Sequence, residues 1–147
     1  MLRGFVILIV AAAAASAQDA APACLMTLND AANAMTRTAR SVCYPQYTAD
    51  VVKFDNNPNC NIYATSYYAT TCDPIVANYM KCTLKAAKLL KVNNTFDEAA
   101  FKATTLKNKC STDAKFIAAY PPCKNSTMKY LHVSRFIFCL MQNTYGE

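Results

Sequence analysis

Eight cysteines constrain this chain more than any other feature, because their bonds limit which segments can lie side by side. An even number of cysteines in a small exported chain is typical of disulfides, whereas in the cytosol it would suggest metal binding or redox chemistry. The spacing contains no C-x-x-C pair and the chain has one histidine, which disfavours a zinc site. We therefore predict four disulfides, with the pairing left open among on the order of 100 possibilities. The residues are Cys24, Cys43, Cys60, Cys72, Cys82, Cys110, Cys123 and Cys139.

The first residues decide which of these two interpretations applies. Residues 1–17 carry one positive charge, an apolar run from Phe5 to Ala15 and a small-residue ending at Ala17, which is the pattern of a secretory signal peptide. The mature chain would be residues 18–147, long enough for a single helical cysteine-rich domain with its own core. Its longest apolar stretch, residues 136–141, is far short of the roughly 20 residues that cross a bilayer. We expect a secreted, extracellular protein without a transmembrane segment.

Glycine is almost absent beyond the predicted signal peptide. Gly146 is the only one, so the glycine turns that β-hairpins favour are missing, while helix formers such as alanine, lysine, leucine and methionine are plentiful. The sequence therefore predicts an all-α fold, a disulfide-braced helical bundle of about five helices. Apolar periodicity predicts helices over residues 24–42, 73–92, 96–109, 113–119 and 126–145, with a short helix within 60–71 and loops at 44–47 and 55–59.

Three signals place the helix ends. Asp73 before Pro74 predicts a helix start, because the carboxylate can accept from free amides of the first turn while proline sits where no donor is needed. Thr95 followed by Glu98 has the form of a capping box. Two consecutive prolines at 121–122 should end the short helix before them.

Helix length also excludes some disulfides. At a rise of about 1.5 Å per residue, cysteines at the two ends of a long helix lie much farther apart than the about 7 Å that bonded Cα atoms allow. On the expected helices, this excludes a bond between Cys24 and Cys43 and one between Cys123 and Cys139. Each long helix should therefore be bonded to another part of the bundle.

Two N-glycosylation sequons are present, N-N-T at residues 93–95 and N-S-T at residues 125–127. Both are expected in turns directly before a helix, where an acceptor side chain is accessible. In a secreted chain Asn93 and Asn125 are therefore predicted to carry glycans.

Signals for catalysis are weak. His132 is the only histidine, and no serine or free cysteine stands in a recognisable nucleophile motif. We therefore expect a protein that is not an enzyme and has no cofactor or metal site. Nucleic acid is not an expected partner, because the lysines are scattered and no binding motif is present.

Aromatic and methionine side chains suggest a binding role. Five tyrosines cluster between residues 44 and 68, and four methionines fall on predicted inward faces, where a flexible thioether adapts to irregular cavities and apolar ligands. An ordinary filled core would use the same residue types. The lead hypothesis is a carrier that holds a small hydrophobic molecule between the helices beginning near residues 73 and 126. The expected lining residues are Met80, Leu84, Phe101, Phe138 and Met141.

Two alternatives stay open. A secreted signal, toxin or host-interaction factor would act on an extracellular receptor through its surface and would have a filled core. A cationic membrane-active protein would use the lysine stripe formed by Lys81, Lys85 and Lys88, in a chain whose formal net charge is +6.

Overall fold

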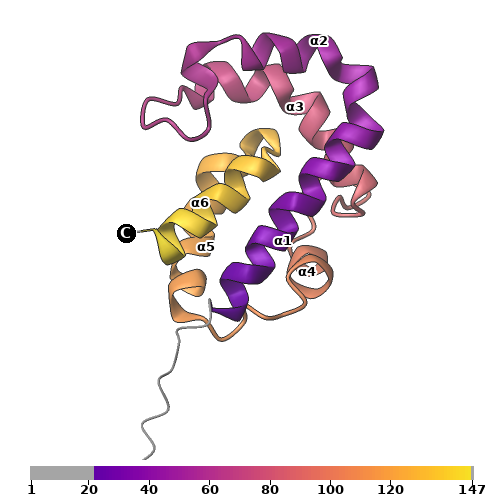
Figure 1. The fold of residues 1–147 in the computed structure, drawn as a ribbon. Helices are drawn as coiled ribbons and strands as arrows, with labels where there is room; N and C mark the ends of the chain where they lie inside the picture. The colour runs from indigo at the N-terminus through magenta and orange to yellow at the C-terminus, as the bar shows by residue number, and fades with distance from the viewer. Residues whose placement is uncertain (1–21, 147) are drawn as a thin grey trace, which may run out of the picture.

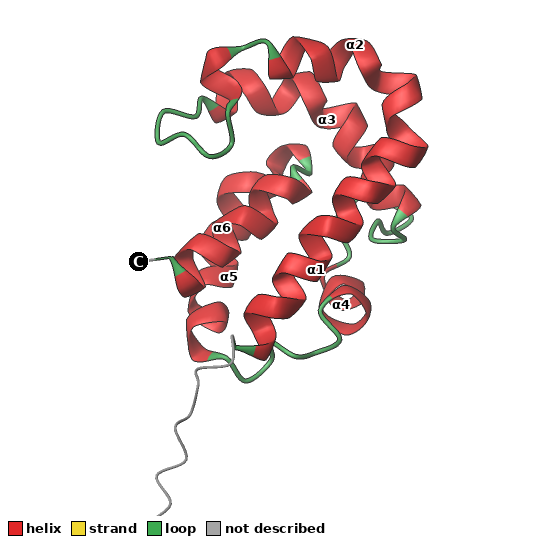
Figure 2. Ribbon diagram, viewed as in Figure 1, coloured by secondary structure: helices red, strands yellow, loops and turns green. Residues whose placement is uncertain are grey.

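The computed structural model describes residues 22–146, and these residues form helices joined by turns and no β-strand (Figures 1 and 2). The predicted all-α fold is confirmed. Its helices are α1 (Ala23–Thr38), α2 (Tyr44–Asp55), α3 (Ala69–Ala86), the short α4 (Glu98–Ala100), α5 (Ala114–Thr127) and α6 (Val133–Tyr145). Two π-helical turns, η1 (Ala39–Cys43) and η3 (Phe101–Thr105), and two 3-10 turns, η2 (Pro58–Cys60) and η4 (Met128–Tyr130), extend or connect them. The predicted signal peptide lies outside the described residues.

The helices form two groups that α1 connects. α2 packs on α3 at one end of the molecule, and α5 packs on α6 at the other (Figure 1). α1 lies along α6, and its continuation η1 reaches α3. One apolar cluster runs through both groups, with Leu28 on α1, Leu84 on α3 and Phe136 on α6 fully buried. None of the described helices is long and apolar enough to cross a membrane.

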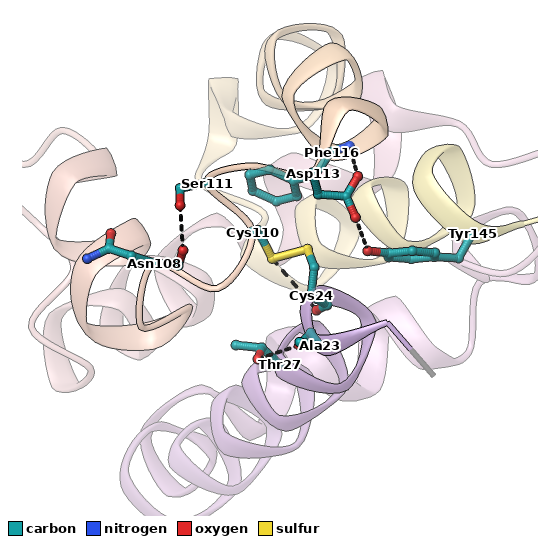
Figure 3. The surroundings of a disulfide bond; sticks show 9 residues. All are labelled: Ala23, Cys24, Thr27, Asn108, Cys110, Ser111, Asp113, Phe116 and Tyr145. Carbon is teal, nitrogen blue, oxygen red and sulfur yellow. Dashed lines mark hydrogen bonds between the residues drawn. A yellow bond between two sulfur atoms is a disulfide. The ribbon is translucent and has the colours of Figure 1, made fainter. Parts of the chain in front are cut away.

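All eight cysteines are bonded, as predicted, and the structure resolves the pairing. The bonds are Cys24–Cys110, Cys43–Cys82, Cys60–Cys72 and Cys123–Cys139. The first ties the start of α1 to the segment before α5, where the Tyr145 hydroxyl of α6 also donates to Asp113, the N-cap of α5, at 2.5 Å (Figure 3). Both ends of the described chain are thus fixed at one place.

The exclusion of a Cys123–Cys139 bond was wrong. It assumed one helix over residues 126–145, but the chain reverses after η4, where Leu131 takes a left-handed conformation with φ of 58°. Cys123 and Cys139 therefore lie on neighbouring helices, α5 and α6, with Cα atoms 5.6 Å apart. The exclusion of Cys24–Cys43 agrees with the structure, because α1 and η1 form one continuous helical segment between them.

The prolines do not mark helix ends where we expected them. α5 continues through the pair at 121–122, whose missing amides would have bonded the carbonyls of Ile117 and Ala118. All four of these residues are exposed, so water can reach the two freed carbonyls. α3 begins at Ala69, before Pro74, and its additional turn contains Cys72, which is bonded to Cys60.

Three other boundaries differ from the expectations. Residues 44–47, expected as a loop, start α2, and only Tyr47 leaves helical geometry. The N-cap of α4 is Asp97, whose carboxylate accepts from the Ala100 amide at 3.0 Å, in place of a box formed by Thr95 and Glu98. The expected short helix within 60–71 is limited to η2 and the first residues of α3, and the stretch between them is the long loop beside α3 in Figure 2.

Candidate functional site

A cavity with a volume of about 1080 Å³ lies between the α2–α3 pair and the start of α6. Its apolar wall comes from α2 and α3, and from Ile62 and Tyr63 in the loop that follows η2. The α3 residues Val76, Tyr79 and Met80 are buried and close the inner side. From α2 come Val51 and Phe54, both partly buried. Aliphatic, aromatic and thioether groups thus form one part of the lining, and polar side chains, among them Thr36, Asn57 and Asn61, form the rest.

Charged and polar side chains lie toward the exposed rim. Arg40 of η1 and Asp55 at the end of α2 are exposed and line the cavity, one charge of each sign. Tyr44 at the start of α2 and Tyr63 in the loop are exposed aromatic groups at the same cavity, with 38% and 73% of their surface accessible. The rim therefore carries no net charge from these groups.

The inner end of the cavity is formed by the two residues that flank the start of α6, His132 and Ser134. His132 is the N-cap of α6 and is 1% exposed, and its Nδ1 accepts from the Arg135 backbone amide at 3.4 Å. Burial, and to a smaller extent the nearby positive charge of Arg135, lowers the pKa of His132 to about 3. The imidazole is therefore neutral at physiological pH.

A buried ion pair holds this inner end in place. Asp73 is 3% exposed and accepts from Arg135 Nη1 and from the Tyr67 hydroxyl, each at 2.6 Å. The Arg135 guanidinium also lies over the Tyr67 ring, 4.2 Å from its centroid. Burial raises the pKa of Asp73 against the lowering effect of these two partners, and burial raises the pKa of Tyr67 as well. A buried carboxylate is tolerated when it is paired and hydrogen-bonded in this way.

This cluster connects the loop before α3, α3 itself and α6. Sequence reasoning assigned Asp73 to capping a helix, whereas the structure uses it to bind an arginine that is 62 residues away. No local sequence pattern identifies an arginine so far away as the partner of Asp73. The one available signal was that Asp73 stands among apolar residues, where a buried carboxylate needs a partner.

The five predicted lining residues do not come together at one site. Met80 lines the cavity, whereas Leu84 and Phe101 are fully buried in the apolar cluster away from it. Phe138 packs edge-on against Tyr63, with ring centroids 5.0 Å apart, and Met141 is partly buried against the core. The prediction missed Val51, Phe54, Val76 and Tyr79, although the cluster of tyrosines pointed to this part of the chain.

The predicted modification and charge sites differ in their surroundings. Asn93 is exposed in the turn after α3, as expected, and its side chain accepts from the amide and hydroxyl of Thr95. Asn125 is exposed but lies within α5, and Thr127 of its sequon is buried, with its hydroxyl donating to the Cys123 carbonyl at 2.7 Å. The expectation of a turn at Asn125 was therefore wrong, because α5 does not stop at the prolines.

The lysine stripe is only partly a helix face. Lys81 and Lys85 are exposed on α3, but Lys88 follows the end of α3 and has a left-handed φ of 59°. The three charges therefore do not continue one helical row.

A second, smaller pocket of about 350 Å³ lies by η3 and α5, beside Leu106, Phe116 and Ile117. The Lys102 ammonium lies at this pocket, 4.2 Å from the centroid of the Tyr120 ring. Within residues 22–146, no group of histidine, cysteine and acidic side chains is arranged to hold a metal ion.

Comparison of the chain with models of known protein families, with curated proteins and with solved structures finds no match.

Proposed function

We propose that this protein is a secreted, non-enzymatic carrier that binds a small, mainly apolar molecule in the cavity between α2, α3 and the start of α6. The observation that carries the proposal is the cavity itself, whose volume of about 1080 Å³ has buried apolar side chains on its inner side and polar groups at both its rim and its inner end. Sites for small molecules are typically clefts of about 300–1,000 Å³ with this composition.

The disulfides support a cavity that keeps its shape without a ligand. Cys43–Cys82 joins the segment before α2 to α3, and Cys60–Cys72 joins the loop that lines the cavity to the start of α3. A site fixed before binding loses less conformational entropy when the ligand enters. The walls are thus bonded to one another at two points.

The four disulfides also support an extracellular location, because such bonds persist in oxidising compartments. The signal-peptide pattern of residues 1–17 agrees with export. In a eukaryotic host we expect a glycan on Asn93, whose turn is exposed, and lower occupancy at Asn125, which lies within a helix. Intact mass before and after glycosidase treatment, with Asn93→Gln as the comparison, measures this.

The binding proposal is tested by titrating the oxidised protein with N-phenylnaphthylamine, whose fluorescence rises in apolar sites. We expect saturable binding of one probe per chain. Val51→Trp places a large ring into the cavity from α2 and should weaken binding at least about tenfold. Val52→Trp is the matched control, since the neighbouring side chain is 45% exposed and does not line the cavity.

Either of two results would contradict the proposal: no saturable binding by the wild type, or the same loss of affinity in both tryptophan variants. Native mass spectrometry of protein secreted from a eukaryotic host gives an independent readout, because a resident ligand adds mass that is lost on denaturation.

A second candidate is a protein ligand that acts through its surface. Tyr63 and Tyr68 favour it, because both rings are more than half exposed and lie in the loop before α3. Aromatic residues of this kind are enriched at protein interfaces. This candidate expects saturable binding to a receptor that survives Val51→Trp and is lost when both tyrosines are replaced by serine.

A further inference from the structure

The inner end of the cavity contains a hydrogen-bond donor without a partner. His132 Nδ1 accepts from the Arg135 amide, and the ring is neutral, so its single proton resides on Nε2. Nε2 is buried and has no hydrogen-bond partner among the described residues. Leaving such a group unpaired in the folded state is unfavourable, because the hydrogen bond that it made to water is lost.

None of the polar groups near the imidazole accepts a hydrogen bond from Nε2. The rings of Phe54 and Tyr67 pack near it, with centroids 5.8 Å and 6.4 Å away, and the Tyr67 hydroxyl is bonded to Asp73. Both carboxylate oxygens of Asp73 are occupied, one by Tyr67 and one by Arg135. The Ser134 hydroxyl, the other polar group at this end, contacts only the Met80 sulfur, at 3.9 Å.

The same end carries no uncompensated charge. Arg135 is paired with Asp73, and His132 is neutral, so a ligand carboxylate would find no free cation there. An uncharged acceptor fits this environment better, because a buried ion without a partner is far more costly than a neutral oxygen.

We propose that the ligand of the cavity is an uncharged, mainly apolar molecule with one carbonyl oxygen, and that this oxygen accepts a hydrogen bond from His132 Nε2. The inference rests on the proposed carrier function and names the chemistry of its ligand. Phe54 lines the cavity and packs on the imidazole, so its ring must turn to bring the oxygen to Nε2. The apolar remainder of the ligand would lie along Val76 and Met80.

The test compares methyl octyl ketone with n-decane, two probes of equal chain length, as competitors of N-phenylnaphthylamine. The measured quantity is the ratio of the two affinities, so the different water solubilities of the probes cancel between protein variants. His132→Asn keeps an acceptor for the helix cap, and its shorter side chain places no N–H group at the position of Nε2. We expect the ketone preference to fall about tenfold in this variant, the usual effect of one hydrogen bond to a buried donor.

Ser134→Ala is the matched control, because it removes a hydroxyl group, the second hydrogen-bond donor at the same end. It should change the ratio by less than about twofold. A tenfold loss in Ser134→Ala with none in His132→Asn would overturn the assignment to His132.

A second measurement needs no substitution. The chain has one histidine, so nitrogen-15 spectra of histidine-labelled protein contain a single imidazole. We expect the tautomer protonated on Nε2, with a shift of the Nε2 signal on adding the ketone and a much smaller one on adding decane. A proton on Nδ1, or equal shifts with both probes, overturns the inference. If both probes bind without dependence on His132, the carrier function stands and this inference fails; if neither displaces the fluorophore and the fluorophore itself does not bind, both fail.

Discussion

The two ends of this bundle use similar side chains but differ in what lies between the helices. At the α5–α6 end, Phe136 is surrounded by the rings of Phe96, Phe101 and Tyr120, with centroids 5.2–5.7 Å away. At the α2–α3 end, the rings of Phe54, Tyr63 and Tyr79 border a cavity of about 1080 Å³. Both ends contain disulfides, so the bonds alone do not explain the difference.

The two ends also differ in the polar groups between their helices. At the α2–α3 end, a buried ion pair of Asp73 and Arg135, with Tyr67, occupies the contact between α3 and α6. At this contact the helices are joined by hydrogen bonds in place of packed rings. At the other end the ion pair of Lys124 and Glu98 lies at the surface, with more than a third of each side chain exposed, and the interior is left to aromatic rings. The cavity thus lies beside the buried polar cluster, whereas the end without such a cluster is filled by aromatic rings.

The largest predicted effect tests the packed end. Phe136→Ala should cost about 3–5 kcal/mol of unfolding free energy, because a fully buried ring among other rings leaves a void. Phe54→Ala, at a partly buried ring beside an existing cavity, should cost less than about 2 kcal/mol. Urea unfolding of the oxidised variants measures both values. Equal costs would show that the two ends are equally well packed.

The next effect compares the two ion pairs. Arg135→Met should cost about 3–5 kcal/mol, because it leaves the Asp73 carboxylate buried without its charged partner. Glu98→Gln should cost less than about 1 kcal/mol, since exposed pairs contribute little. Adding Asp73→Asn to Arg135→Met should restore part of the lost stability. A single-variant cost at Arg135 as small as that at Glu98 would show that the buried pair contributes no more to stability than the exposed one.

Most of the helices could be predicted from the sequence, because the spacing of apolar residues indicates a helix whichever partner that helix packs against. The pattern over residues 24–42 corresponds to α1 and η1, and the all-α fold followed from the lack of glycine. The ends were harder to predict. Leu131 reverses the chain with a positive φ that glycine normally takes, and nothing local distinguishes it from a helical leucine.

The cavity itself could not be derived from the sequence. Met80 and Phe101 are alike as apolar helix residues, yet one lines the cavity and the other is fully buried in the core. Which of them borders a void depends on how far apart the helices stand. The residues that join these helices, such as Asp73 and Arg135, meet only in the folded chain.

A pH effect tests the polar end further. The pKa of His132 is lowered to about 3 in the folded state by burial and by Arg135, whereas an unfolded histidine titrates near its ordinary value of 6.5. The unfolded state therefore binds the proton first, and the unfolding free energy should fall by about 1.4 kcal/mol for each pH unit below 6.5.

The measurement belongs between about pH 7 and pH 5, where this slope dominates. At lower pH Asp73, which faces the same cluster with Tyr67 and Arg135, has a raised pKa and takes up a proton in the folded state, which opposes the loss. His132→Asn should flatten the slope in the upper range. A wild type whose stability is constant over this range would show that His132 is not buried as a neutral ring.

The smallest predicted effect concerns the pocket of about 350 Å³ at the packed end. Ile117 lines that pocket and is 54% exposed, so Ile117→Trp fills it while changing the unfolding free energy by less than about 0.5 kcal/mol. If the α2–α3 cavity is the site of N-phenylnaphthylamine, this variant should bind the probe within about twofold of the wild type, in contrast to Val51→Trp. A loss of affinity in Ile117→Trp together with unchanged binding in Val51→Trp would reverse the comparison and place the binding site beside Lys102 and Tyr120.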